Sequence, residues 1–154
     1  MKTLSLVLLM SLSATLTFAQ DVSFRSNREK QTQKTKLFIG ESSRFAVRKS
    51  LPRELMNYQL NQQVEVAISS KTTFKGKVTA ITNDAPGLQT IIMQSSETPG
   101  LVLSISKLDI QGEGTTYRGV LISKNHSDLL MMEKDSKTGE YIWSKKEVAH
   151  MIPD

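Results

Sequence analysis

Three adjacent residues, His126, Ser127 and Asp128, are of the types that form a hydrolase triad. In such a triad a serine hydroxyl attacks a carbonyl carbon, a histidine accepts the hydroxyl proton, and a carboxylate orients the imidazole. Neighbouring residues of an extended chain point to opposite sides, so these three side chains cannot converge in that geometry. No GxSxG motif occurs elsewhere. The sequence therefore predicts a polar turn that leads into a strand, and no nucleophilic catalysis.

The other motifs that could hold an ion or a phosphate lack essential groups. Residues 135–140, DSKTGE, begin like a calcium loop, but Lys137 stands where an oxygen ligand is needed. Residues 112–116, GEGTT, contain an isolated GxG without the lysine and helix of a phosphate-binding loop. His126 and His150 are the only histidines and cysteine is absent, so a zinc site would need distant carboxylates. We expect no cofactor, no metal and no enzymatic activity.

Positive charge is concentrated in one part of the chain, whose net charge is +5. Residues 22–53 hold nine basic and two acidic residues, which gives +7, while residues 54–154 hold ten basic and twelve acidic residues, which gives −2. A basic segment can attract an anionic partner such as lipopolysaccharide, extracellular nucleic acid or an acidic groove of another protein. The alternative is a solvated linker. Nucleic acid is disfavoured because aromatic residues make up only 6% and no nucleic-acid module signature is present.

The first nineteen residues are typical of a secretory signal peptide. Lys2 precedes an apolar run over residues 4–10, and Thr17 and Ala19 are the small residues that signal peptidase requires. Cleavage after Ala19 would place the mature N-terminus at Gln20 and the protein in the periplasm or outside the cell. A membrane-spanning helix needs about 20 apolar residues, so we expect no transmembrane segment in the mature form. The absence of cysteine from an exported chain indicates a core that is stable without disulfides and favours a bacterial source.

An arm before the main domain and a short helix at the start of that domain are expected ahead of the strands. Residues 20–49 form a basic arm, which is polar and without periodicity at first but carries apolar residues from Leu37 onward. A short helix is predicted over residues 51–59, because Ser50 can act as its N-cap and Pro52 suits its first turn.

The chain from residue 64 onward shows the patterns of strands. Residues 64–68, VEVAI, alternate apolar and polar side chains, which is typical of a half-buried strand. The motif TTFKGKV at residues 72–78 recurs as TTYRGVL at 115–121, and TIIM at 90–93 recurs as LLMM at 129–132. We therefore expect an internal repeat, about 72–111 and 115–152, with three strands in each unit. With the first strand, the repeat predicts an all-β, mainly antiparallel barrel or sandwich over residues 50–154.

Each repeat unit carries an aromatic residue two positions before a glycine, namely Phe74 before Gly76 and Tyr117 before Gly119. Residues i and i+2 of a strand share a face, and the glycine leaves a gap on that face where the strand can bend. We expect both aromatic rings to fill equivalent corners of the core. The alternative is a pair of equivalent binding sites. Trp143 is also expected in the core.

The order of four segments, SLPRELMNYQLNQQVEVAI, FKGKV, LVLSI and YRGVLI, resembles the β-rich N-terminal, propeptide-like domains of secreted bacterial metallopeptidases. The resemblance covers about residues 50–125. The matching positions are Leu51, Pro52, Leu55, Val64, Val66, Phe74, Gly76, Val78, Tyr117 and Gly119. It implies a module that binds or restrains a peptidase. The 154 residues contain no HExxH motif, so this chain is not itself the peptidase.

These observations together predict a secreted, non-enzymatic binding module, and more specifically an inhibitor or propeptide-like partner of a peptidase. The expected contacts lie in the arm, where apolar and basic side chains alternate and could enter a groove with an acidic rim. They are Leu37, Phe38, Ile39, Arg44, Arg48 and Lys49. The alternative for this segment is an edge strand of its own domain that contacts nothing else. The alternative for the protein is a cell-surface structural or adhesion module that binds an anionic envelope polymer or a glycan.

Overall fold

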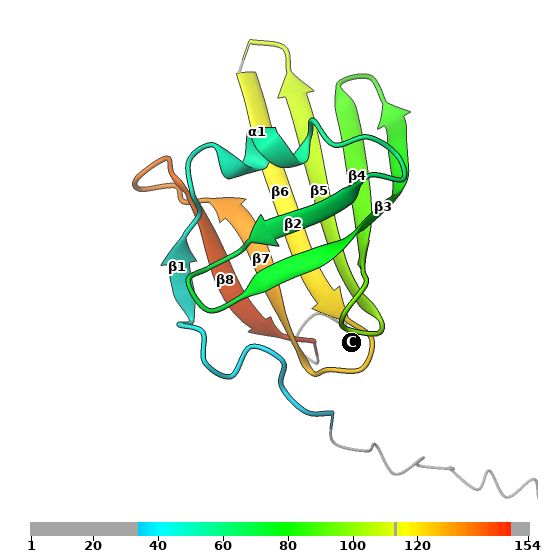
Figure 1. Ribbon diagram of the computed structural model, residues 1–154. Coiled ribbons are helices and arrows are strands. Elements are labelled where there is room, and N and C mark those ends of the chain that lie inside the picture. Colours follow the sequence, from blue (N-terminus) through cyan, green and yellow to red (C-terminus); the bar gives the residue numbers. More distant parts are fainter. Residues whose placement is uncertain (1–33, 113, 149–154) are drawn as a thin grey trace, which may run out of the picture. The chain divides into compact units, whose positions relative to one another are not determined.

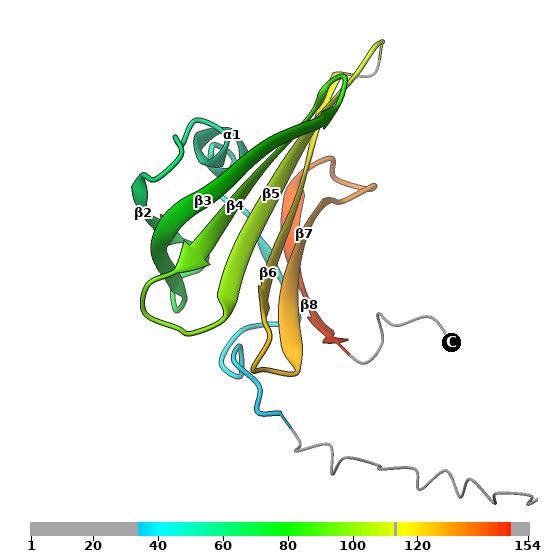
Figure 2. The same ribbon diagram turned by 90° about the vertical axis from the view of Figure 1, so that its right-hand side faces the viewer.

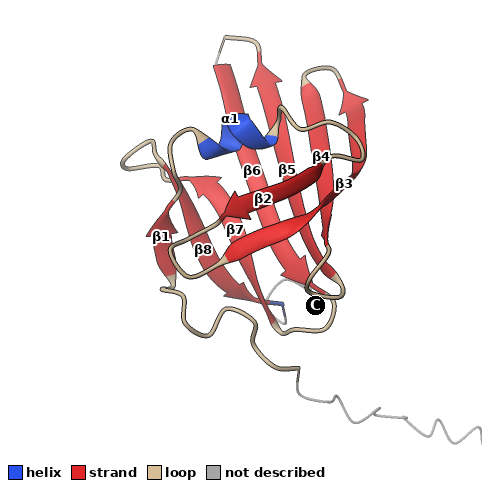
Figure 3. Ribbon diagram, viewed as in Figure 1, coloured by secondary structure: helices blue, strands red, loops and turns tan. Residues whose placement is uncertain are grey.

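The computed structural model describes residues 34–112 and 114–148 (Figure 1). They form one antiparallel sheet of eight strands and one short helix, α1 (Leu51–Leu55), as Figure 3 shows. The strands are β1 (Arg44–Ala46), β2 (Gln63–Ala67), β3 (Thr73–Ala85), β4 (Leu88–Ser95), β5 (Leu101–Ile110), β6 (Gly114–Ser123), β7 (Asp128–Lys134) and β8 (Tyr141–Glu147). The predicted signal peptide and the first part of the basic arm lie outside the described residues.

The sheet is a meander that curls into a half-barrel (Figure 2). Its strand order is β1-β8-β7-β6-β5-β4-β3-β2, so each strand from β2 to β8 lies beside the next in the chain, and β1 crosses over to pair with β8. The predicted all-β, antiparallel class is confirmed. The predicted closure into a barrel or sandwich is corrected, because a single sheet is present and its edge strands β1 and β2 do not pair with each other. The arm supplies an eighth strand that the strand count from residue 64 onward did not include.

The core lies on one face of the sheet because the strands alternate buried and exposed residues. In β2 the buried residues are Val64 and Val66, as the sequence predicted. Leu51 and Leu55 of α1 pack into the same core, and so do Phe38 and Val47 from the segment before the helix. Trp143 is fully buried there, which confirms its predicted position. The core therefore depends on residues from the predicted arm.

The helix is shorter than predicted and ends at Leu55, not at residue 59. Pro52 occupies its first turn as expected, and Ser50 is the N-cap residue, although its side chain makes no capping hydrogen bond. After the helix, the Asn57 N–H donates to the Glu54 carbonyl at 3.1 Å. This i to i−3 bond tightens the chain into a turn and ends the α-helical hydrogen-bond pattern.

The structure does not show the predicted repeat as two equivalent units. Gly76 of β3 pairs with Ser95 of β4, and the sequence repeat would therefore place Gly119 opposite Lys134. Gly119 instead pairs with Met132, two residues away. The β3–β4 pair also contains a register shift between Val78 and Ala80, which the β6–β7 pair lacks. Similar motifs thus occupy different registers.

Candidate functional site

We call residues 36–49 the strap, because this segment folds back along its own domain. β1 within it pairs with β8. The Asp128 carboxylate, which is buried, accepts hydrogen bonds from the backbone N–H groups of Leu37 and Phe38 at 2.6 and 2.9 Å. The Lys145 Nζ donates to the carbonyl oxygens of Phe38 and Glu41 at 3.1 and 2.9 Å. This segment is therefore folded back as an edge strand of its own domain.

Glu41 joins the strap to the turn between β2 and β3. Its carboxylate accepts hydrogen bonds from the hydroxyl groups of Ser69 and Thr72. Partial burial opposes ionisation of this carboxyl, but the two hydrogen bonds and the positive charges of Lys71 and Lys145 outweigh it and hold the pKa of Glu41 below its ordinary value of 4.5. The strap is thus anchored by polar contacts on two sides, to β7 and β8 through Asp128 and Lys145 and to the β2–β3 turn through Glu41.

The six predicted contact residues do not form one surface. The Phe38 side chain is only 3% exposed and belongs to the core, so it cannot contact a partner, and Leu37 is partly buried against that core. Ile39 is 76% exposed. Arg44 forms an ion pair with Asp135 at 2.7 Å. The predicted role in partner binding stays a prediction for the exposed members of the set.

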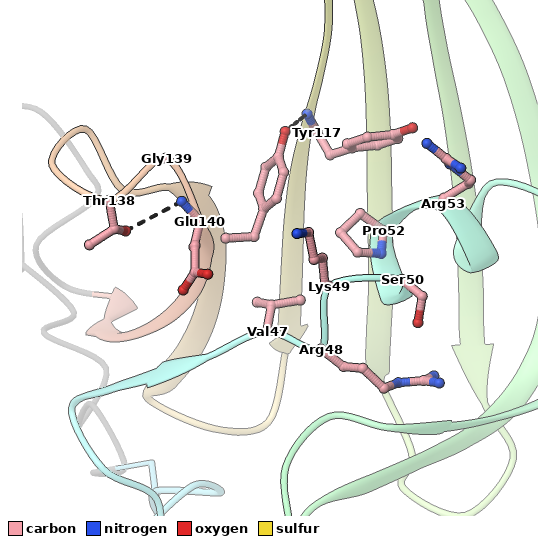
Figure 4. A pocket seen from close by; sticks show the side chains of 11 residues that line it. Val47, Arg48, Lys49, Ser50, Pro52, Arg53, Tyr117, Thr138, Gly139 and Glu140 are labelled. Atoms are coloured by element: carbon pink, nitrogen blue, oxygen red, sulfur yellow. Dashed lines mark hydrogen bonds between the residues drawn. The ribbon is translucent and has the colours of Figure 1, made fainter.

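The two remaining members, Arg48 and Lys49, line a pocket of about 840 Å³ (Figure 4). One wall is formed by the end of the strap, the N-cap residue and the first turn of α1. Its residues are Val47, Arg48, Lys49, Ser50, Pro52 and Arg53. The opposite wall is formed by Tyr117 of β6 and by residues 138–141 of the β7–β8 hairpin. The hairpin turns sharply at Gly139, whose φ of 73° lies in the left-handed region, as expected for a glycine turn. Three segments that are far apart in the sequence therefore meet here.

Two tyrosines give the pocket an aromatic wall. The rings of Tyr117 and Tyr141 pack edge to face, with centroids 5.8 Å apart and an interplanar angle of 71°. The Tyr141 hydroxyl oxygen accepts a hydrogen bond from the Tyr117 backbone N–H at 2.9 Å. The Tyr117 hydroxyl makes no hydrogen bond with another described residue. Its half-buried ring is therefore held in place while its polar end remains available to a ligand.

Phe74 and Tyr117 do not play equivalent roles. Phe74 is 1% exposed and is part of the core, whereas Tyr117 packs against the core from the pocket. The expectation of two equivalent corners, and its alternative of two equivalent binding sites, are both wrong for this pair. Tyr117 lines a ligand-sized space, whereas Phe74 is enclosed in the core.

The pocket carries an excess of positive charge. Its ionised lining residues are Arg48, Lys49, Arg53 and Glu140, three cations and one carboxylate, which gives +2. Arg48 is compensated outside the pocket by Glu54, with which it makes two hydrogen bonds of 3.2 and 2.6 Å. Within the described part of the chain, Lys49 and Arg53 form no ion pair or hydrogen bond. This arrangement can hold an anionic group next to an apolar or aromatic one.

Sequence reasoning missed three features of this region: Asp128, Tyr117 and the hairpin wall. Asp128 is an acidic residue at the start of an otherwise apolar strand, which is a signal for a buried partner. The hairpin DSKTGE was interpreted only as a turn. The contribution of Tyr117 had no separate signal, because its motif also occurs at the buried Phe74.

Over residues 34–112 and 114–148, no group of three or more His, Cys, Asp or Glu residues is placed to hold a metal ion. In the same ranges no helix is long and apolar enough to cross a membrane. Comparisons with protein-family models, with curated proteins and with solved structures found no match for this chain.

Proposed function

We propose that this protein is a secreted, non-enzymatic binding module whose pocket takes an acidic segment of a partner protein. The observation that carries the proposal is the presence of two cations without an ion pair among the described residues, Lys49 and Arg53, beside the half-buried ring of Tyr117. A carboxylate of the partner can pair with the cations while a neighbouring apolar side chain packs on the ring. Arginine and tyrosine in a pocket of this kind commonly supply most of the affinity of a protein interface.

A secreted peptidase is the partner that the sequence supports best. The resemblance to propeptide-like domains covers Leu51 and Pro52, and the latter lines the pocket. The N-terminal pattern of a signal peptide supports export to the compartment where such peptidases act. The module would then bind or restrain a peptidase supplied by another chain.

A second candidate function is a cell-surface module that binds an anionic envelope polymer, since the same two cations also suit that ligand. The two functions differ in what they require of Tyr117. A flexible polyanion binds through charge and its affinity falls steeply with salt. Binding of a protein partner also depends on apolar packing against the Tyr117 ring. Binding of a polyanion through charge alone does not involve that ring.

The test is capture from the secreted or periplasmic fraction with the mature chain and with the variant Lys49→Glu/Arg53→Glu. The matched control, Lys77→Glu/Lys146→Glu, makes the same charge change at exposed residues outside the pocket. We expect wild type and control to retain a peptidase and the pocket variant to bind it at least tenfold more weakly. Equal retention by all three proteins would rule out the pocket as the binding site.

The variant Tyr117→Ala separates the two candidate functions. We expect it to weaken binding of a protein partner, whereas a polysaccharide held by charge alone should bind as tightly as it binds the wild type and should lose affinity steeply with salt. A thermal melt confirms that the variant is folded. Retention of polysaccharide alone, with the same affinity in Tyr117→Ala, would favour the envelope-binding function.

A further inference from the structure

β2 is the last strand of the sheet, and the hydrogen bonds at its two ends show which of its residues face β3. The Val78 N–H donates to the Gln62 carbonyl at 3.0 Å, and the Ile68 N–H donates to the Thr72 carbonyl at 2.9 Å. In an antiparallel pair every second residue bonds to the neighbouring strand. The even-numbered residues of β2 therefore bond to β3, and the odd-numbered residues direct their N–H and C=O groups away from it.

The outward-facing residues are Gln63, Glu65 and Ala67, and all three have exposed side chains. Among the described strands, β3 alone pairs with β2. Within the described ranges, no side chain or loop backbone group bonds to the six outward N–H and C=O groups of these residues. Such a row is a template for another strand.

The two edges of the sheet are protected to different degrees. β1 has three residues, and Arg44 at its start is held by an ion pair with Asp135. β2 has five residues, a single charged residue and no irregularity in its pairing with β3. Short length, charges and bulges are the usual means of blocking an edge. β2 lacks them apart from Glu65, so its own residues protect it less than those of β1 protect the other edge. α1 lies on the side of β2 away from β3 (Figure 1), and the outward-facing side chains of β2 remain exposed beside it.

We propose that the free edge of β2 is a second docking site, at which an extended segment of another polypeptide adds to the sheet as a ninth strand. Only a polypeptide backbone offers alternating donors and acceptors at the spacing of the outward groups. None of the residues of β2 lines the pocket, so this surface is separate from the site proposed above.

The charge on the edge indicates which segment fits. Lys75 is the residue opposite Glu65 on β3, but its Nζ forms an ion pair with Glu97 at 3.2 Å. The Glu65 carboxylate lies beyond ion-pair distance of the described cations, although its charge, after that of Glu97, also helps to raise the pKa of Lys75. A lysine or arginine opposite Glu65 on the incoming strand would fill that position. On the core side, alternate apolar residues would extend the row of Val64 and Val66.

A second copy of the chain is a poorer occupant. In the fully paired register, antiparallel pairing of two β2 strands about their centre would place Glu65 opposite its own equivalent. Like charges directly opposite each other destabilise a strand pair. The incoming segment therefore belongs to a different polypeptide.

The test uses the mature chain and a synthetic hexapeptide, acetyl-TFKVKV-amide, which places a lysine opposite Glu65 as β3 does. NMR should show saturable shifts of the amide signals of residues 63, 65 and 67, with at least tenfold slower hydrogen exchange at these three positions. The charge-reversed peptide acetyl-TFEVEV-amide should bind at least tenfold more weakly, and Glu65→Lys should reverse that preference.

Two proline variants serve as a matched pair, and thermal melts establish that both are folded. Ala67→Pro removes one outward N–H from β2 and should abolish peptide binding. Ala46→Pro removes an outward N–H from β1, because Phe45 and Val47 are the residues on the β8 side, and should leave binding unchanged. The proposal is overturned by shifts confined to other residues, by equal binding of the two peptides, or by protection of the three amides through self-association alone.

Discussion

At the scale of single residues, two glycines with the same sequence context have different surroundings. A Cβ atom at Gly76 would lie 2.3 Å from the backbone oxygen of Gln94, which is part of the neighbouring strand. A Cβ atom at Gly119 would lie 3.2 Å from side-chain atoms of Met132 and 3.3 Å from the Trp143 ring. At Gly119 the Met132 Cε can move aside, and the Met132 Cβ and the Trp143 ring need to give by only a few tenths of an ångström, whereas at Gly76 the paired backbone of Gln94 would have to shift much further. Glycine is therefore required more strictly at position 76.

The first prediction follows from this difference. Gly76→Ala should reduce the free energy of unfolding by about 1 to 3 kcal/mol, because β3 and β4 must separate to admit the methyl group. Gly119→Ala is the matched control and should reduce the free energy by less. Urea denaturation of both variants measures the difference. Equal losses would show that the close approach of Gly76 to Gln94 does not limit packing.

At the scale of elements, the strap is a structural part of the domain. Phe38 and Val47 contribute to the core, and β1 extends the sheet beyond β8. Asp128 and Lys145 satisfy backbone groups of the strap, so its docking does not leave polar groups buried without partners. An arm that served only as a partner contact or a spacer would have no need of these interactions.

The second prediction concerns removal of the strap. A chain without residues 20–49 should lose at least about 3 kcal/mol of stability, the usual cost of removing one buried phenylalanine side chain, and should melt about 10 °C lower. A chain that begins at Lys34 keeps every contact described above and is the control. Calorimetry compares the two. An unchanged melting temperature on deletion would return the segment to the role of a detachable arm.

At the scale of the whole molecule, the proposed secreted function depends on removal of the predicted signal peptide. The pattern at residues 1–19 predicts cleavage after Ala19, and this region lies outside the described residues. The intact mass of the exported protein should therefore correspond to a chain that begins at Gln20. A mass that includes Met1 to Ala19 would contradict both the signal peptide and the proposed secreted function.

Local sequence patterns were enough for much of the fold. Alternation over residues 64–68 identified β2, and the glycine turn at residues 135–140 separated β7 from β8. The burial of Trp143 also followed from the sequence. These features depend on side-chain period and turn conformation, which neighbouring residues control. The short helix was predicted for the same reason, although the predicted turn over residues 56–59 is not helical.

Features made by long-range contacts could not be derived in this way. β1 is three residues long and becomes a strand only because β8 pairs with it. The strand registers around Gly76 and Gly119 differ because of a bulge and of packing. The two motifs are therefore similar in sequence but not equivalent in structure. The pocket joins residues 47–53, Tyr117 and residues 138–141, and the free edge of β2 exists only because the curled sheet does not close. Each of these depends on which strands meet across the fold, and no local pattern carries that information.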